Sequence, residues 1–153
     1  MIDSMEDKEN KNRWALESID RAIVWTNQRE QQNLSVALDP LGEYAQTAKQ
    51  AEESSSKYLN TLNAIKTSQC NASLAVKLSS LGLSFNRSQA EKHLQKIIEH
   101  ASKASILVEI DIEGTPTVPV ICEIAQNHAR AGKSLVLALQ AYLDRSTDYN
   151  APR

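Results

Sequence analysis

The chain has 153 residues, the size of a single domain, and its 41% hydrophobic and 24% charged residues are ordinary for a globular protein. A formal net charge of −2 argues against a nucleic-acid-binding surface, and no apolar stretch approaches the roughly 20 residues that cross a bilayer. The polar start of the chain is neither a signal peptide nor a typical transit peptide, which favours a cytoplasmic protein, with peripheral attachment to the inner membrane as the alternative.

The elements expected along the chain alternate between helix and strand. Residues 1–12 are polar and are expected to be disordered, so that one domain spans 13–153. An amphipathic helix is expected over residues 13–30. Strands are then expected at 34–39, 72–80, 105–111 and 134–139, with helices between them at about 40–68, 86–104 and 115–133.

The helix expected at 86–104 carries a recognisable start signal. Either Asn86 or Ser88 can cap it, since both side chains accept hydrogen bonds from the first turn. Glu91 lies three residues after Ser88, the spacing of a capping box.

Five consecutive apolar residues, Leu135 to Leu139, indicate a strand buried on both faces. The helices between successive strands are long enough to be crossovers, which favours parallel strands. The sequence therefore predicts an α/β fold with about four parallel strands, crossover helices and an N-terminal helix.

All four expected strands end on a side chain that forms hydrogen bonds: Asp39, Lys77, Asp111 and Gln140. In parallel α/β folds the carboxyl ends of the strands form the floor of the active site, so a polar ring is expected there. Lys77 needs a partner if it is buried, and Asp111 on the next strand is the obvious one. Glu113 is expected to face the same side and to support the pocket. The alternative is that the strands simply reach the surface at these residues.

Metal and disulfide chemistry are not expected. The three histidines, His93, His100 and His128, lie in expected helices without the spacing of a metal site. Cys70 and Cys122 form no metal motif and are expected to be free structural thiols.

The strand ends resemble a known family. "LDPLGE", "AVKLSSLGL", "VEIDIEG" and "VLALQAYLDRS", in that order and spacing, are similar to the flavin-dependent proline dehydrogenase family from about residue 34 to residue 149. The resemblance implies a (β/α)₈ barrel that holds FAD at its carboxyl face. It also implies oxidation of L-proline to pyrroline-5-carboxylate, with a quinone as the electron acceptor.

The resemblance also implies residue roles. Lys77 corresponds to the family's barrel lysine beside flavin and substrate, and Asp111 to the aspartate that organises the substrate pocket. Gln140 corresponds to the glutamine near the flavin ring, where its amide would tune the flavin's electronics. Asp39 and Glu43 match the first-strand motif and are expected to support the pocket.

The family's later basic strand and paired arginines are not found after residue 149. Because a full barrel takes about 250 residues, the sequence predicts only the N-terminal half, a partial TIM-type barrel with little activity alone. Its open edges at 34–38 and 135–139 are expected to favour self-association. Two alternatives remain open: a non-catalytic half-barrel that acts as an interaction protein, and an unrelated α/β domain that binds a small ligand.

Overall fold

One four-stranded parallel sheet organises the molecule, as seen in a computed structural model that describes residues 15–141. The strands are β1 (Val36–Leu38), β2 (Ala72–Lys77), β3 (Val108–Asp111) and β4 (Leu135–Ala138), and they lie side by side in sequence order. The prediction of parallel strands in a partial barrel is confirmed. The segment predicted to be disordered, residues 1–12, lies outside the described residues.

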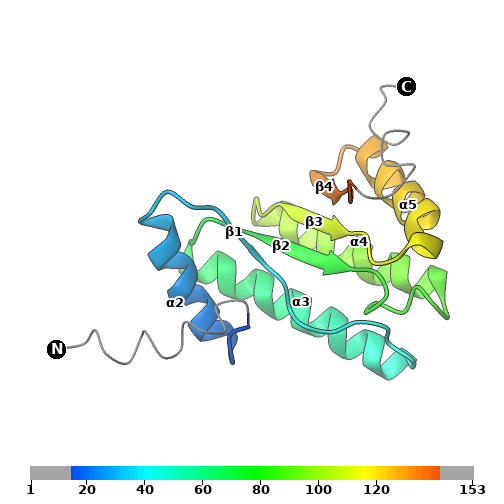
Figure 1. Ribbon diagram of the computed structural model, residues 1–153, viewed down its shortest axis with the longest axis horizontal. Helices are drawn as coiled ribbons and strands as arrows, with labels where there is room; N and C mark the ends of the chain where they lie inside the picture. Colours follow the sequence, from blue (N-terminus) through cyan, green and yellow to red (C-terminus); the bar gives the residue numbers. More distant parts are fainter. Residues whose placement is uncertain (1–14, 142–153) are drawn as a thin grey trace.

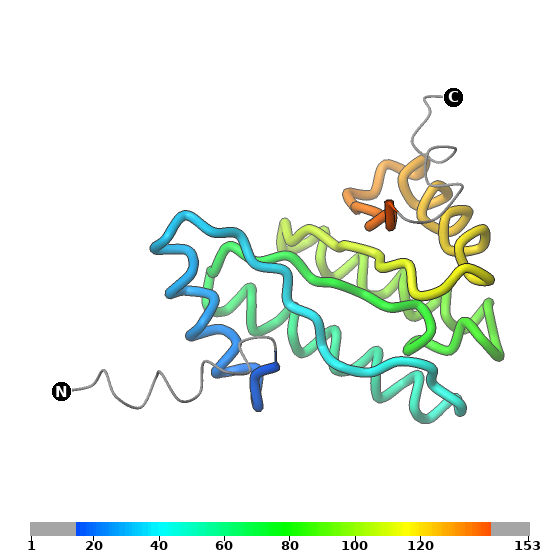
Figure 2. Tube along the Cα trace, viewed as in Figure 1, coloured from blue at the N-terminus to red at the C-terminus, as the bar shows by residue number. Residues whose placement is uncertain are grey.

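A helix connects each strand to the next, as the tube in Figure 2 shows. The helices are α2 (Ile19–Glu30), α3 (Ala48–Ser68), α4 (Arg87–Lys103) and α5 (Val118–Arg130), the last preceded by a short 3-10 turn, η2 (Thr115–Thr117). In Figure 1, α2 lies beside β1 at one end of the sheet and α5 beside β4 at the other. The helices α3 and α4 pack on each other between them.

The start of α4 differs from the predicted capping box. Asn86 is the cap, and its side chain accepts a hydrogen bond from the backbone N–H of Gln89 at 3.1 Å. Ser88 lies inside the helix, and the Glu91 carboxylate pairs instead with the guanidinium of Arg87 at 2.6 Å. The helix therefore begins at Arg87, two residues earlier than a cap at Ser88 would allow, and the Asn86 side chain satisfies a free N–H of its first turn.

The core lies between one face of the sheet and the helices. Alternate residues of β3 show it: Val108 and Ile110 are fully buried, whereas Glu109 and Asp111 are half-buried. Successive side chains in a strand point to opposite faces, so one face of the sheet is dry and the other polar. The dry face packs against apolar side chains of α3, α4 and α5, among them Leu62, Ile65, Leu94, Ile97 and Ile121.

The prediction that β4 is buried on both faces is wrong. Its residues are half-buried at most, and Val136 is 44% exposed. Within the described residues β4 pairs only with β3, so it is an edge strand. Val136 lies on the polar side of the sheet, where it is left uncovered. β1 is the other edge, with Leu34 before it 52% exposed, so the positions of the two predicted edges are confirmed.

Two further expectations concern the chain as a whole. Cys70 and Cys122 are both buried free thiols, as predicted. Over residues 15–141, none of the helices is both long and apolar enough to traverse a bilayer.

Candidate functional site

A cavity of about 350 Å³ opens at the carboxyl ends of the strands. It lies on the polar side of the sheet, where β2, β3 and β4 end in register at Lys77, Asp111 and Ala138. Its walls carry most of the polar side chains predicted for the site; they are formed by Glu43, Lys77, Asp111, Ile112, Glu113, Ala138, Leu139 and Gln140. The predicted convergence of a lysine, an aspartate and a glutamine at one rim is therefore observed.

Lys77 lies between two carboxylates. Its ammonium forms an ion pair with Asp39, which follows β1, and its Nζ lies 3.8 Å from Oδ2 of Asp111 on β3. The expectation that Asp111 is the chief partner is corrected, because Asp39 makes the closer contact with the Lys77 ammonium. Asp39 directly follows β1, whose pairing with β2 ends at Leu38 opposite Leu74, three residues before Lys77.

Lys77 and Asp111 shift each other's pKa. Partial burial alone would lower the pKa of Lys77, but the hydrogen bond and charge of Asp39, with Asp111, outweigh it and raise that pKa above its usual value. Burial raises the pKa of Asp111, and the nearby Lys77 ammonium offsets only part of that rise. The site therefore keeps a permanent cation beside a carboxylate that takes up a proton more readily than usual.

Gln140 lies two residues after the end of β4, which stops at Ala138, and its side chain turns toward the segment that follows β3. Its side-chain amide nitrogen donates a hydrogen bond to the backbone carbonyl of Ile112 at 2.9 Å. This bond holds the amide at the cavity wall, beside the ends of β3 and β4. The polar residue that follows an apolar strand is thus kept in place by a backbone carbonyl just after the adjacent strand, β3.

Glu113 ties three loops together. Its carboxylate accepts a hydrogen bond from the Ser79 N–H at 2.9 Å and another from the Ser79 hydroxyl. Ser79 in turn accepts from the backbone N–H of Tyr44 at 3.0 Å through its hydroxyl and from that of Ala45 at 3.1 Å through its carbonyl. The loops that follow β1, β2 and β3 are therefore joined at one serine, which the sequence reasoning did not single out.

Glu113→Gln is expected to remove the pH-dependent contribution that the Glu113 carboxyl makes to the free energy of unfolding. Burial is the largest influence on the pKa of Glu113 and raises it, while the two bonds from Ser79 lower it, and the net result is a raised pKa. A raised acid pKa means that the folded state holds the proton longer, so this contribution to stability is present below the unfolded pKa and is lost as pH rises through the folded pKa. The unfolding free energy of the wild type, measured with urea, should therefore fall relative to the variant over that window. A difference that is constant from pH 4 to pH 7 would contradict the burial of this carboxylate.

Other polar residues near the site also escaped the sequence reasoning. Ser73 donates a hydrogen bond to the Glu109 carboxylate on the polar face of the sheet. Tyr58, which sequence pattern assigns to the apolar side of a helix, hydrogen-bonds to Ser80 behind the end of β2. Ser79 and Ser80, two and three residues after Lys77, were the available signal, because hydroxyl side chains often bond to the backbone where a strand ends.

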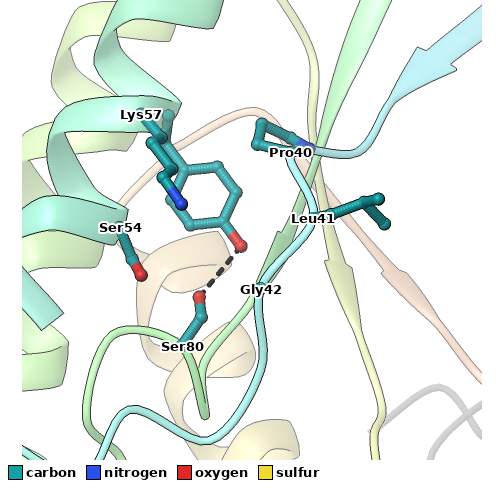
Figure 3. Close-up of a pocket in the computed structure, with 7 residues that line it drawn as sticks. Pro40, Leu41, Gly42, Ser54, Lys57 and Ser80 are labelled. Atoms are coloured by element: carbon teal, nitrogen blue, oxygen red, sulfur yellow. Dashed lines mark hydrogen bonds between the residues drawn. The ribbon is translucent and has the colours of Figure 1, made fainter. Parts of the chain in front are cut away.

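Behind that bond lies a second, much smaller gap, shown in Figure 3. It has no room for a water molecule and is lined by Pro40, Leu41, Gly42, Ser54, Lys57, Tyr58 and Ser80. The gap is a packing defect under the loop after β1 rather than a ligand site, so the cavity at the strand ends is the candidate site.

Comparison with known proteins points to one family. The family model for proline dehydrogenase matches residues 22–151. Proline dehydrogenase 2 of Bacillus subtilis (strain 168) is 30% identical over 125 residues, which are 82% of this chain and 41% of that protein. Proline dehydrogenase 1 of the same strain is 28% identical over 132 residues, 86% of this chain and 44% of that protein. The chain thus spans less than half the length of the curated relatives it matches.

Solved structures show the same fold. Proline utilization A from Bdellovibrio bacteriovorus, inactivated by N-propargylglycine, matches 86% of this chain and 17% of its own with a TM-score of 0.78 at 17% identity. Proline utilization A from Bradyrhizobium japonicum, a D779W mutant, matches 75% of this chain and 14% of its own with a TM-score of 0.67 at 22% identity. The four-stranded sheet and its helices, together with the family match over most of the sequence, lead to one conclusion: the chain belongs to the proline dehydrogenase family.

Proposed function

We propose that this chain contributes the first four strands of the active site of a flavin-dependent proline dehydrogenase, which oxidises L-proline to pyrroline-5-carboxylate. One observation carries the proposal. In a chain of this family, the cavity at the strand ends brings together an ammonium, three carboxylates and an amide that lie at or after the ends of four successive strands. Because the chain spans 41% of a matched relative, the activity is proposed for a protein that also contains the remaining strands.

The residues of the cavity fit a flavin and a small amino acid. A volume of about 350 Å³ is within the range of small-ligand pockets, roughly 300–1,000 Å³. Gln140 and Lys77 would hold the polar edge of the flavin ring, since amide and ammonium groups are donors that ring oxygens and nitrogens accept. When bound, FAD accepts the hydride that leaves proline as its C–N bond becomes C=N, while the amine gives up a proton.

The chain's own residues would bind and orient the substrate. Lys77 keeps its charge because its pKa is raised, and its ammonium has three N–H donors, of which Asp39 takes one. The other two would be available for the polar edge of the flavin ring and the carboxylate of L-proline. Asp111 would take part in organising the pocket beside the substrate amine, and Asp39, Glu43 and Glu113 would hold Lys77 and the surrounding loops in place.

Two measurements test the proposal. The full chain, alone and joined to the part of Proline dehydrogenase 2 that follows the matched segment, would be titrated with FAD and the flavin fluorescence followed. The joined protein would then receive L-proline without oxygen, with D-proline as the control. We expect the joined protein to bind flavin. We expect the flavin absorbance to be lost with L-proline but not with D-proline. Bound flavin that L-proline does not reduce would contradict the proposed substrate, and absence of bound flavin would contradict the cofactor.

A quinone as the electron acceptor is part of the same proposal and stays a prediction. The alternative of an α/β domain unrelated to this family is excluded by the family match over residues 22–151. The alternative of a half-barrel that associates with itself is favoured by the exposed side chain of Val136 on the edge strand β4. Light scattering of the purified chain distinguishes a monomer from a dimer.

A further inference from the structure

The backbone of Lys77 lies where the sheet loses a strand. β1 pairs with β2 only as far as Leu38 opposite Leu74, before β2 reaches Lys77. The N–H of Leu74 donates to the carbonyl of Leu107 at 2.9 Å, on the β3 side. Successive backbone groups of a strand point alternately to its two sides, so those of Lys77 point to the side that β1 has left. The sheet ladder therefore offers them no partner there.

Two hydroxyl groups replace the missing strand. The Lys77 N–H donates to the Tyr58 hydroxyl oxygen at 3.1 Å, and the Ser80 hydroxyl donates to the Lys77 carbonyl at 2.7 Å. The hydroxyls of Tyr58 and Ser80 lie 3.0 Å apart, the bond marked at Ser80 in Figure 3. Because Ser80 has one proton and gives it to the carbonyl, Tyr58 is the donor between them. The four groups form a closed circuit that satisfies both backbone groups of Lys77.

The circuit is rigid because of where Tyr58 lies. The residue comes from α3 and is 1% exposed, with its ring in the core between α3 and the sheet. Burial is the main influence on its hydroxyl and raises the pKa of Tyr58 above the usual value, so the proton needed for the circuit is retained at ordinary pH. The end of β2 is thus anchored to a packed helix rather than to a neighbouring strand.

We propose that Tyr58 and Ser80 are positioning residues for Lys77: their hydroxyl circuit fixes the backbone from which the ammonium reaches into the cavity between Asp39 and Asp111. The consequence for proline oxidation rests on the function proposed above. The positioning itself is a property of the free chain and needs neither flavin nor substrate. Neither residue contacts the cavity, so the effect on the site passes through Lys77.

The test compares Tyr58→Phe with wild type by amide hydrogen exchange and NMR. Val76 is the internal reference, because its N–H points to the β3 side and is not part of the circuit. The exchange rate at Lys77 relative to Val76 is expected to rise about tenfold, as the loss of one hydrogen bond to a buried group implies. The pKa of the Lys77 ammonium, followed in the same samples, should fall toward its ordinary value.

Tyr44→Phe is the matched control, since the half-exposed side chain of Tyr44 forms none of the three hydrogen bonds of this circuit and the same chemical group is removed. It should leave the rate ratio unchanged. Equal acceleration at Lys77 and Val76 in Tyr58→Phe would overturn the proposal, because it would mean that the hydroxyl contributes only to global stability.

Ser80→Ala provides a second variant should Tyr58→Phe fail to fold. It removes the donor to the Lys77 carbonyl but leaves the Tyr58 hydroxyl as an acceptor for the N–H, so a smaller rise of the ratio, about threefold, is expected. An unchanged ratio here would also overturn the proposal. Because no flavin is present, these results do not depend on the outcome of the proline reduction experiment, and the two proposals fail separately.

Discussion

Replacing Lys77 with Met is expected to reduce proline-dependent flavin reduction by about a hundredfold and to lower the unfolding free energy by about 1.5–3 kcal/mol, the range for hydrogen bonds to charged groups. The reduction would be measured in the joined protein of the proposed test, and the stability with urea. The physical reason is that Asp39 and Asp111 would then face each other without the cation that lies between them.

The pH dependence of this variant has a definite sign. The folded pKa of Lys77 is raised, so its contribution to stability is complete below the unfolded pKa and is lost as pH rises through the folded value. In acid the loss also shrinks, because Asp111 has a raised pKa and takes up a proton, which removes the charge that Lys77 offsets. The destabilisation by Lys77→Met should therefore be largest near neutral pH and smaller in acid.

Lys92→Met is the matched control, an exposed lysine on α4 that undergoes the same chemical change. It should alter both stability and flavin reduction little, since exposed substitutions stay within about 0.5 kcal/mol. If Lys77→Met behaved like Lys92→Met in flavin reduction, the site role of Lys77 would be wrong. Loss of stability with unchanged reduction would make Lys77 a structural lysine only.

Ile110→Ala is expected to have the largest effect on stability, a loss of about 2–5 kcal/mol. Ile110 lies in the middle of β3 and is fully buried on the dry face of the sheet. The truncation removes apolar contacts and leaves a cavity that the packed helices cannot fill. Urea unfolding of the full chain measures the loss.

Val136→Ala serves as the comparison, because Val136 is an apolar strand residue of the same sheet that is 44% exposed. Its loss should be within about 0.5 kcal/mol, as for other surface positions. Similar losses for the two variants would contradict the division of the sheet into a dry and a polar face. They would indicate that the polar face is covered as well.

Local chemistry explains the part of the site that could be predicted. An apolar run that ends on Lys77, Asp111 or Gln140 is visible in the sequence, and parallel strands place such ends at one edge whatever the details of packing. The residues that hold these side chains were less visible. Tyr58 lies on the apolar stripe of a helix, and its hydrogen bonds with the Lys77 N–H and the Ser80 hydroxyl separate it from an ordinary core tyrosine.

The sequence alone determined the alternation of helices and strands and their order along the chain, through the periodicity of apolar residues and the breaks between them. The polar strand ends also determined that polar side chains cluster at one rim of the sheet. Three features depended on distances between segments remote in sequence: Asp39 as the nearer partner of Lys77, Ser79 as the junction of three loops, and the exposure of Val136. Asp39 and Ser79 lie just beyond the ends of β1 and β2, where another segment must satisfy them, and Val136 is exposed because β4 is an edge strand. The hydrophobic pattern of a strand indicates which of its faces is apolar. The length of the adjacent strand in the sheet is set only when the elements pack.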